Sequence, residues 1–329
     1  MSNNLRGYIY AALSSSSYGV NAFAPILYAV GLTTNSVLFY RYLFATLLTV
    51  GLMFFNKESF RLTLKELLLI CPMGVLFAYS SWSLFEAYKY MGVSLAATVL
   101  FVYPALVAML MWAFFREKPG KITLFAIPIV FLGIVLLDFE GITQGSSSPL
   151  GLVIVLSSAL SYAIYMVVVQ KSCLSNMSST KLSFYSLVFG LLFYVIMTGF
   201  CTEVQPLGTA KEWTVVLALA LFPSLISMST MAKAIKLVGS TATAVLGAFE
   251  PIASVLIGVC LYGERPVLLS WIGMVVILSS VTAVVAQNRI VRIGGKFISY
   301  MQRRIRVRKI HRLRKTIEKR QAKEIAKKA

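Results

Sequence analysis

Ten segments of largely apolar residues, each about 20 residues long, are the feature that most constrains this chain. A segment of that length, folded as an α-helix, crosses the roughly 30 Å hydrocarbon core of a bilayer. Of the 329 residues, 58% are hydrophobic and only 13% are charged, a balance outside that of water-soluble domains. We therefore predict an all-α integral membrane protein, with transmembrane spans 1 to 10 at 7–29, 35–55, 66–86, 92–114, 121–139, 150–170, 181–202, 213–232, 240–262 and 267–288.

The loops between these spans carry Lys and Arg unevenly. Counting from an N-terminus inside, the inner side holds Arg6, Lys57, Arg61, Lys65, Arg116, Lys118, Lys121, Lys171, Lys181, Lys233 and Lys236. The outer loops hold only Lys89, Lys211 and Arg265. By the positive-inside rule, we predict a multi-pass protein of the cytoplasmic (inner) membrane with both termini in the cytoplasm. No small-residue cleavage site ends the first span, so we expect it to be a retained helix.

The sequence also repeats itself without a gap. Residues 87–119, "AYKYMGVSLAATVLFVYPALVAMLMWAFFREKP", align with residues 234–266, "AIKLVGSTATAVLGAFEPIASVLIGVCLYGERP", at an offset of 147. The shared residues include Gly92/Gly239, Pro104/Pro251, Glu117/Glu264 and Pro119/Pro266. Apolar composition raises chance matches among apolar residues, but it does not place Gly, Pro and Glu in register.

A second match, at an offset of 144, pairs Ser14, Ser17 and Tyr18 with Ser158, Ser161 and Tyr162. We predict two five-helix repeats, 1–145 and 146–288, and an odd number of spans gives the two copies opposite senses in the membrane. Inverted repeats can rock about a site between them and open it to each side in turn. This favours a carrier, with a facilitative channel or uniporter as the alternative.

The residues resemble the EamA-type proteins of the drug/metabolite transporter superfamily. The resemblance lies in Ala-x-Lys-x-x-Gly at 234–239, in Glu250-Pro251, in Gly263-Glu264-Arg265 and in the Arg-containing second span "FYRYLFATLL" (39–48), and it extends from residue 7 to about 288. It implies ten helices, a central cavity lined largely by spans 1, 3, 4, 6, 8 and 9, and export of small metabolites such as amino acids. The sequence departs from the family pattern where it has Tyr18-Gly19 in place of Trp-Gly.

Glu250 lies about halfway along span 9. A charge at this depth costs at least ~2.5 to 3.5 kcal/mol, so we expect the carboxylate to face a wet cavity, to pair or to bind a proton. One hypothesis is proton coupling or binding of a substrate amine. The other is structural: Glu250 bridges the backbone groups freed by Pro251, whose missing N–H interrupts the helix.

Arg41 is the basic residue that lies well inside a span, about six residues or roughly 9 Å from the outer end of span 2. We favour an interpretation in which its side chain snorkels to the outer headgroups. The alternatives are a pair with Glu250 or a bidentate contact with a substrate carboxylate.

Aromatic and small polar side chains on the expected cavity helices complete the candidate substrate site. Any single one of them is more often a packing residue than a ligand. The candidates are Tyr18, Asn21, Tyr79, Ser83, Tyr103, Tyr162, Tyr165 and Ser227.

The last 41 residues, 289–329, differ sharply from the rest. They carry 16 of the 31 Lys and Arg residues and only two Glu. Apolar residues recur at helical intervals among the basic ones, which predicts an amphipathic cytoplasmic helix lying on anionic lipid. Neither interleaved aromatic residues nor a recognition fold supports a nucleic-acid partner.

Signs of catalysis are weak. The single histidine, His311, lies in the basic tail, and no hydrolase, zinc-protease or nucleotide-binding motif is present. The four cysteines form no C-x-x-C pair, so we expect neither a metal site nor a cofactor. We predict a secondary carrier that exports a small molecule, with amino acids as the first choice, while a membrane-embedded enzyme remains a third alternative.

Overall fold

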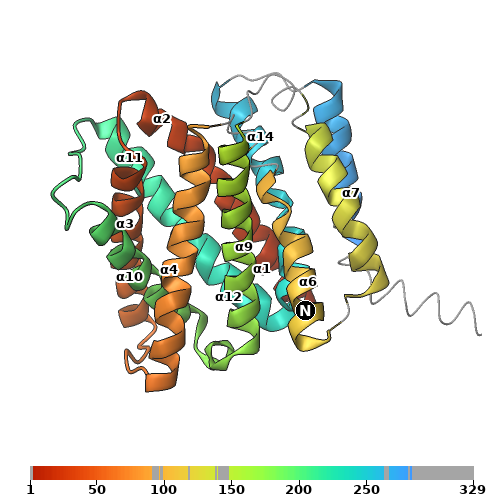
Figure 1. Ribbon diagram of the computed structural model, residues 1–329, viewed down its shortest axis with the longest axis horizontal. Coiled ribbons are helices and arrows are strands. Elements are labelled where there is room, and N and C mark those ends of the chain that lie inside the picture. Colours follow the sequence, from red (N-terminus) through yellow and green to blue (C-terminus); the bar gives the residue numbers. More distant parts are fainter. Residues whose placement is uncertain are drawn as a thin grey trace, which may run out of the picture. The chain divides into compact units, whose positions relative to one another are not determined.

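A computed structural model describes residues 3–90, 96, 99–117, 119–137, 139, 148–262, 267–280 and 282–283 (Figure 1). The chain separates into two units, Met1–Val284 and Val285–Ala329, and the described helices all belong to the first. The predicted basic tail and the Gly263-Glu264-Arg265 element lie outside the described residues.

The described residues are helical and contain no strand. Five helices, one of them interrupted, are long and apolar enough to cross a membrane: Thr34–Phe55, Leu64–Ala87, Pro149–Lys171, Ser179–Met197 and Ala210–Val238. The elements are α1 (Asn3–Tyr18), η1 (Gly19–Phe23), α2 (Ala24–Ala29), α3 (Thr34–Phe55), α4 (Leu64–Ala87), α6 (Tyr103–Phe115), α7 (Lys121–Leu137), α9 (Pro149–Lys171), η2 (Cys173–Asn176), α10 (Ser179–Met197), α11 (Ala210–Leu219), η3 (Ala220–Ile226), α12 (Ser227–Val238), α13 (Ser240–Leu246), α14 (Phe249–Tyr262) and a last helix at Leu268–Ser280. The all-helical prediction is confirmed for this part of the chain, and the number of ten crossings stays a prediction.

Side-chain caps fix where several helices begin. Thr33 accepts a hydrogen bond from the backbone N–H of Ser36 at the start of α3. Thr63 and Glu66 form a capping box on α4, in which each side chain bonds the other's backbone N–H. Thr209 and Glu212 do the same on α11. These bonds satisfy backbone donors that the first turn of a helix leaves free.

Within the part of the chain that the structure describes, four of the predicted spans are interrupted. Span 1 passes through the 3₁₀ segment η1, and span 8 passes through the π-helical segment η3, which contains Pro223. Span 9 breaks at a turn at residues 247–248, and span 4 has the equivalent turn at 101–102, before α6. Irregular backbone is tolerated at membrane depth only where protein or a cavity surrounds it, so these breaks mark the interior of the bundle.

The break in span 9 explains why the helix tolerates a proline directly after Glu250. Pro251 is the third residue of α14, and Pro104 is the second residue of α6. The first four N–H groups of a helix have no intrahelical acceptor, so a proline there costs no hydrogen bond. The interruption therefore precedes Pro251, and the Glu-Pro pair begins the second half of the span.

Helix packing follows the symmetry expected of two related copies. Span 1 (α1) packs along span 8 (α12), and the matching pair of spans 6 (α9) and 3 (α4) packs in the same way. Likewise α14 contacts α1 as α6 contacts α9. The second spans of the two repeats, α3 and α10, lie side by side. So do their fifth spans, α7 and the helix at Leu268–Ser280, which are the yellow and blue helices of Figure 1. These pairings agree with a two-repeat fold.

Two equivalent serine contacts join the paired helices. The Ser14 hydroxyl donates to the Ser227 carbonyl oxygen at 2.8 Å, which joins α1 to α12. The Ser158 hydroxyl donates to the Ser80 carbonyl oxygen at 2.6 Å, and Ser80 donates back to the Ser158 carbonyl at 3.0 Å. Ser14 and Ser158 are related by the 144-residue offset, and Ser80 and Ser227 by the 147-residue offset. Small residues and cross-helix hydrogen bonds let helices approach closely where lipid supplies no hydrophobic driving force.

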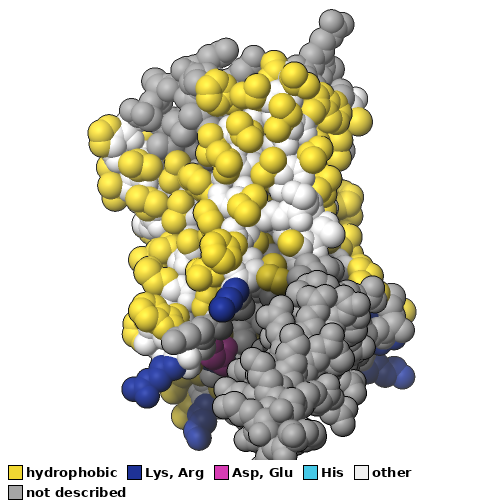
Figure 2. All heavy atoms as spheres, turned by 90° about the vertical axis from the view of Figure 1, so that its right-hand side faces the viewer, with side chains coloured by type: hydrophobic (Ala, Val, Ile, Leu, Met, Phe, Trp, Pro, Cys, Tyr) yellow, Lys and Arg dark blue, Asp and Glu magenta, His cyan; other side chains and the backbone are white. Residues whose placement is uncertain are grey.

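Exposed apolar side chains cover the outside of the bundle. On the face formed by α7 and the helix at Leu268–Ser280, hydrophobic side chains spread over most of the described surface, and Lys and Arg gather near its lower end (Figure 2). The N-terminus of α1 lies toward the same end in Figure 1. The exposed apolar residues on these two helices include Leu124, Phe125, Ile129, Leu132, Leu268, Trp271 and Val275. A surface of this kind suits hydrocarbon.

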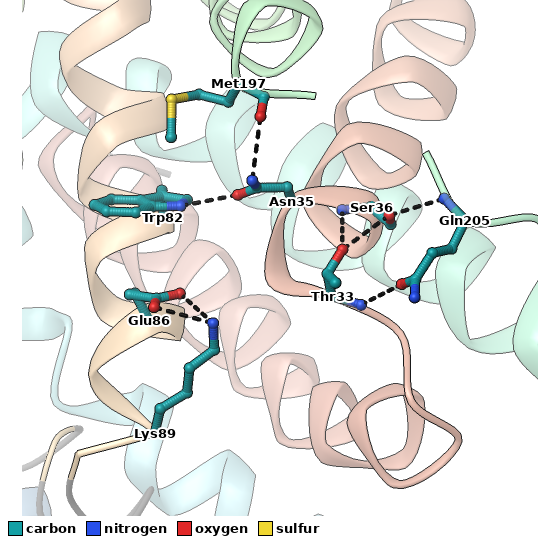
Figure 3. Close-up of polar contacts among 8 residues, drawn as sticks. All are labelled: Thr33, Asn35, Ser36, Trp82, Glu86, Lys89, Met197 and Gln205. Atoms are coloured by element: carbon teal, nitrogen blue, oxygen red, sulfur yellow. Dashed lines mark hydrogen bonds and ion pairs between the residues drawn. The ribbon is translucent and has the colours of Figure 1, made fainter. Parts of the chain in front are cut away.

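Polar contacts fasten the opposite end of the bundle. Asn35 of α3 accepts from the Trp82 indole N–H of α4 at 3.0 Å and donates to the Met197 carbonyl oxygen of α10 at 3.2 Å (Figure 3). The Gln205 side chain, in the connection before α11, accepts from the Thr33 N–H at 2.6 Å. In this conformation, α3, α4 and α10 are therefore held together at the end away from the N-terminus.

Gly190 provides a test of this close packing. A Cβ atom added at Gly190 would lie 2.5 Å from the ring of Tyr42, which is fully buried between α3 and α10. We expect Gly190→Ala to destabilise the protein by about 1–3 kcal/mol, the usual cost of overpacking. Thermal unfolding in detergent measures the effect. Gly51→Ala is the matched control, because a Cβ there meets nothing within 4 Å, and an equal loss in both variants would contradict the packing argument.

Candidate functional site

A small cavity lies among the helices of both repeats. Spans 1, 4, 6, 8 and 9 line it, whereas no described residue of span 3 does, although the resemblance implied one. Its volume is about 10 Å³, room for about one water molecule. In this conformation the cavity is too small for a metabolite. The lining residues are Ser14, Ser15, Tyr18, Tyr103, Tyr162, Met166, Ser227, Met231, Thr243, Gly247 and Glu250.

Tyrosines from spans 4 and 6 meet the break in span 9. The Tyr103 hydroxyl donates to the Ala244 carbonyl oxygen at 3.0 Å, one of the carbonyls beside the break. The Tyr162 ring meets Tyr103 edge to face at 4.9 Å between centroids, and its hydroxyl contacts the Met231 sulfur at 3.0 Å. Gly247 leaves the space that the Tyr103 hydroxyl occupies. The two tyrosines thus connect spans 4, 6, 8 and 9 across the cavity.

Glu250 lies in the first turn of α14 and faces this cavity. Among the described residues, neither a hydrogen bond nor an ion pair reaches its carboxylate, and only its backbone N–H is bonded, to the Gly247 carbonyl oxygen at 2.9 Å. The carboxylate therefore does not bridge backbone groups in the way that the structural hypothesis required. The positive end of the α14 dipole favours a negative charge at this position.

Arg41 does not snorkel, and the favoured interpretation is wrong. Its side chain is fully buried, because α3 turns this face toward the interior of the bundle rather than toward lipid. Its Nε donates to the Ser224 hydroxyl at 2.8 Å, and its Nη1 donates to the Asn21 side-chain oxygen at 3.1 Å. Of the acidic side chains in the described part of the chain, none lies within 4 Å of it, so the direct pair with Glu250 is absent there as well.

Three aromatic rings enclose the Arg41 guanidinium. Its central carbon lies 5.7 Å from the centroid of Tyr18, 5.8 Å from that of Tyr42 and 5.9 Å from that of Phe85. Cation–π contacts of this kind compensate part of the cost of burying the charge. Tyr18 also lines the cavity that Glu250 faces, so one ring touches both the Arg41 group and the cavity.

Three predicted site residues lie elsewhere. The Tyr79 hydroxyl pairs with Ser157 at 3.0 Å, and the Ser83 hydroxyl bonds carbonyls of its own helix. Tyr165 is buried against Phe77 and bonds Ser186 at 3.2 Å. The cavity thus gathers Tyr18, Tyr103, Tyr162, Ser227 and Glu250 from the predicted set, while Asn21 belongs to the Arg41 group.

Other cavity residues were not predicted as site residues. Ser14 and Ser15 belong to "SSSS" (14–17), and Met166 and Met231 are apolar members of their spans, so nothing in the sequence separates them from packing residues. Ser224 follows Pro223 in span 8. A proline inside a span is a signal of irregular backbone and could have drawn attention to its neighbour.

Apolar spans, symmetric helix pairs and a cavity shared by both halves are the features of a membrane protein built from two repeats. The sequence profile of the EamA-like transporter family matches residues 5–138 and 149–286. The chain belongs to this family. The family profile thus matches the chain twice, as expected of a sequence with two repeats.

Comparison with solved structures agrees at the level of the fold. One chain, titled only "Crystal structure of protein", superposes with a TM-score of 0.70 at 18% sequence identity, over 87% of this chain and 98% of that one. Among curated proteins, none matches the sequence.

Gly247 is the position to test the geometry of the span 9 break. A Cβ atom there would overlap the Tyr103 hydroxyl and lie 2.7 Å from the Ala244 carbonyl oxygen. We expect Gly247→Ala to lower the unfolding temperature and to cost about 1–3 kcal/mol. Tyr103→Ala removes the first of these two overlaps. Gly247→Ala should therefore cost less in a Tyr103→Ala background than in the wild type. Strictly additive effects in this double-mutant cycle would show that the two residues do not interact.

Proposed function

We propose that this protein is a secondary carrier that exports a small metabolite, with amino acids as the first choice, by alternating access. The two five-helix repeats, 1–145 and 146–288, enter the membrane in opposite senses and rock about the cavity. The observation that carries the proposal is that helices of both repeats, and the breaks in spans 4 and 9, converge on one small cavity. This cavity contains the Glu250 carboxylate, which has no hydrogen-bond or ion-pair partner among the described residues. Discontinuous helices around a midplane site are the usual construction of such carriers.

The small volume of the cavity supports alternating access rather than a permanent pore. A volume of about 10 Å³ cannot pass a metabolite, so transport requires the helices to separate. The Asn35 contacts with Trp82 and Met197 hold one end of the bundle together in this conformation. Breaking them at one end and forming others at the opposite end is the kind of exchange that a rocking motion performs.

Glu250 is our candidate for the coupling residue. Its carboxylate faces the cavity without a described hydrogen-bond or ion-pair partner, and a buried carboxylate of this kind is expensive unless it binds a proton or a cation. The proton gradient across the cytoplasmic membrane would then drive export, with Glu250 alternately protonated from one side and deprotonated toward the other.

Counterflow in proteoliposomes tests the carrier and the role of Glu250 together. Vesicles hold a pool of unlabelled amino acids, and uptake of each labelled one is followed at two pH values and with an imposed pH gradient. We expect Glu250→Gln to retain counterflow, because exchange needs no net proton movement. It should lose the stimulation by the pH gradient, because an amide cannot carry the proton.

Other outcomes assign other roles. If Glu250→Gln responds to the pH gradient as the wild type does, Glu250 has a structural role and not a coupling role. Passive equilibration of label without counterflow favours the channel alternative, because a channel does not couple opposite fluxes. Formation of a chemically altered product would favour the enzyme.

Two cysteines can test the proposed orientation, with both termini in the cytoplasm. Cys201 is exposed after α10 at the proposed outer end, and Cys173 lies after α9 at the proposed inner end. In single-cysteine variants, we expect a membrane-impermeant maleimide added to intact cells to label Cys201 and to leave Cys173 unlabelled. Cys173 should react once the cells are opened. Labelling with the reverse pattern would invert the topology.

A further inference from the structure

The group formed by Arg41, Asn21 and Ser224 holds a buried positive charge that forms no ion pair with a described acidic side chain. Arg41 is exposed to neither water nor lipid, because its exposed fraction is 0%. No described acidic side chain pairs with it. A buried cation without a counterion is costly, and aromatic faces compensate only part of that cost. A site of this kind therefore favours binding of an anion.

Two donors in this group also lack acceptors. Arg41 Nη2 and Asn21 Nδ2 are both buried, and neither has a hydrogen-bond partner among the described residues. The orientation of the Asn21 amide follows from its contact with Arg41, because only the amide oxygen can accept from Nη1. Its NH₂ group must therefore point elsewhere. Two adjacent side chains thus present free donors, and a ligand with two acceptor oxygens would satisfy both.

The backbone around this group is irregular on two sides. Asn21 comes from the 3₁₀ segment η1 of span 1, and Ser224 comes from the π segment η3 of span 8. The two segments contact each other, and η3 packs against α3, which carries Arg41. Segments of 3₁₀ and π helix inside longer helices are frequent at functional sites and hinges. The spans that hold the group are therefore also those whose backbone geometry can change.

Tyr18 separates this group from the cavity. One side of its ring lies over the Arg41 guanidinium, and Tyr18 also lines the cavity that contains Glu250. It is the last residue of α1, directly before η1. Movement of this one side chain would open the cavity toward the Arg41 guanidinium.

We propose that Arg41, Asn21 and Ser224 bind the carboxylate of the transported substrate, with Tyr18 separating this subsite from the cavity in the present conformation. The proposal rests on the carrier function proposed above and specifies the chemistry of its substrate. A carboxylate fits better than a phosphate, because one guanidinium supplies a single positive charge and the carboxylate of Glu250 lies nearby.

Asn21→Asp is the variant that distinguishes binding from a structural role. It would place a permanent carboxylate where the amide oxygen now lies 3.1 Å from Arg41 Nη1. An internal counterion stabilises a buried cation, so the fold should keep or gain thermal stability. The same carboxylate would compete with that of the substrate. A merely structural Arg41 would be satisfied by this change, and transport would be unaffected.

The measurement is a comparison of amino acids with amino acid amides. Counterflow of a pool of labelled L-amino acids is inhibited with a mixture of the same amino acids or with a mixture of their amides. We expect the wild type to prefer the acids by about tenfold or more, the value of a charge-assisted hydrogen bond. In Asn21→Asp this preference should fall to about one, while the unfolding temperature does not fall. Arg41→Lys should retain part of the preference, because it keeps the positive charge but loses the two parallel N–H donors of the guanidinium.

Asn35→Asp is the matched control. Asn35 is a second partly buried asparagine of the same region, but its side chain bonds Trp82 and Met197 and not Arg41. Because these contacts hold one end of the bundle, the rate of counterflow can change in this variant, but the ratio of inhibition by acids to inhibition by amides should not. Inorganic phosphate is included as a competing anion, and we expect no inhibition by it.

The possible failures are separable. If labelled amino acids move and Asn21→Asp keeps the preference for acids, the carboxylate subsite is overturned while the carrier stands. Inhibition by phosphate as strong as that by amino acids would overturn the choice of carboxylate. If neither acids nor amides inhibit, and no label moves with folded protein, the proposed function and the subsite fall together.

Discussion

The requirement that every backbone polar group find a partner away from water shapes this molecule more than any other constraint. Continuous helices meet it by themselves, and most of the described elements do so. The four interrupted spans do not, so they need protein around them. The Tyr103 hydroxyl illustrates the solution, because it donates to the Ala244 carbonyl oxygen beside the span 9 break. Irregular backbone therefore requires an interior position, and the cavity lies where the interrupted spans meet.

Close helix contact is the second condition for such an interior. The Ser14–Ser227 and Ser80–Ser158 pairs occupy equivalent places in the two copies and bring a hydroxyl directly onto the neighbouring backbone. Contacts of this type tie each copy to the other rather than to itself, since α1 packs on α12 and α9 packs on α4. A pair of equivalent interfaces about one cavity is the arrangement that the proposed alternating access requires.

Sequence reasoning was strongest where a residue type has one meaning in a membrane. The Gly, Pro and Glu residues in register identified the repeat, and apolar length located the helices, because few other structures tolerate those patterns in lipid. It was weakest for side-chain direction. Arg41 was expected to reach the headgroups, but the face of α3 that carries it points inward, and length and depth alone do not specify a face. The same limit applies to Tyr79, Ser83 and Tyr165, which are of the right type in the right spans but bond other partners.

The irregular segments explain why the two charges were hard to relate from sequence. Span 1 read as one helix places Tyr18 and Asn21 three residues apart and thus on nearly the same face. The change from α-helix to the 3₁₀ segment at Gly19 instead lets Tyr18 line the cavity while Asn21 bonds Arg41. The π segment of span 8 does the equivalent for Ser227, in the cavity, and Ser224, at Arg41. Two breaks, one in each repeat, divide the polar residues between a carboxylate and a guanidinium.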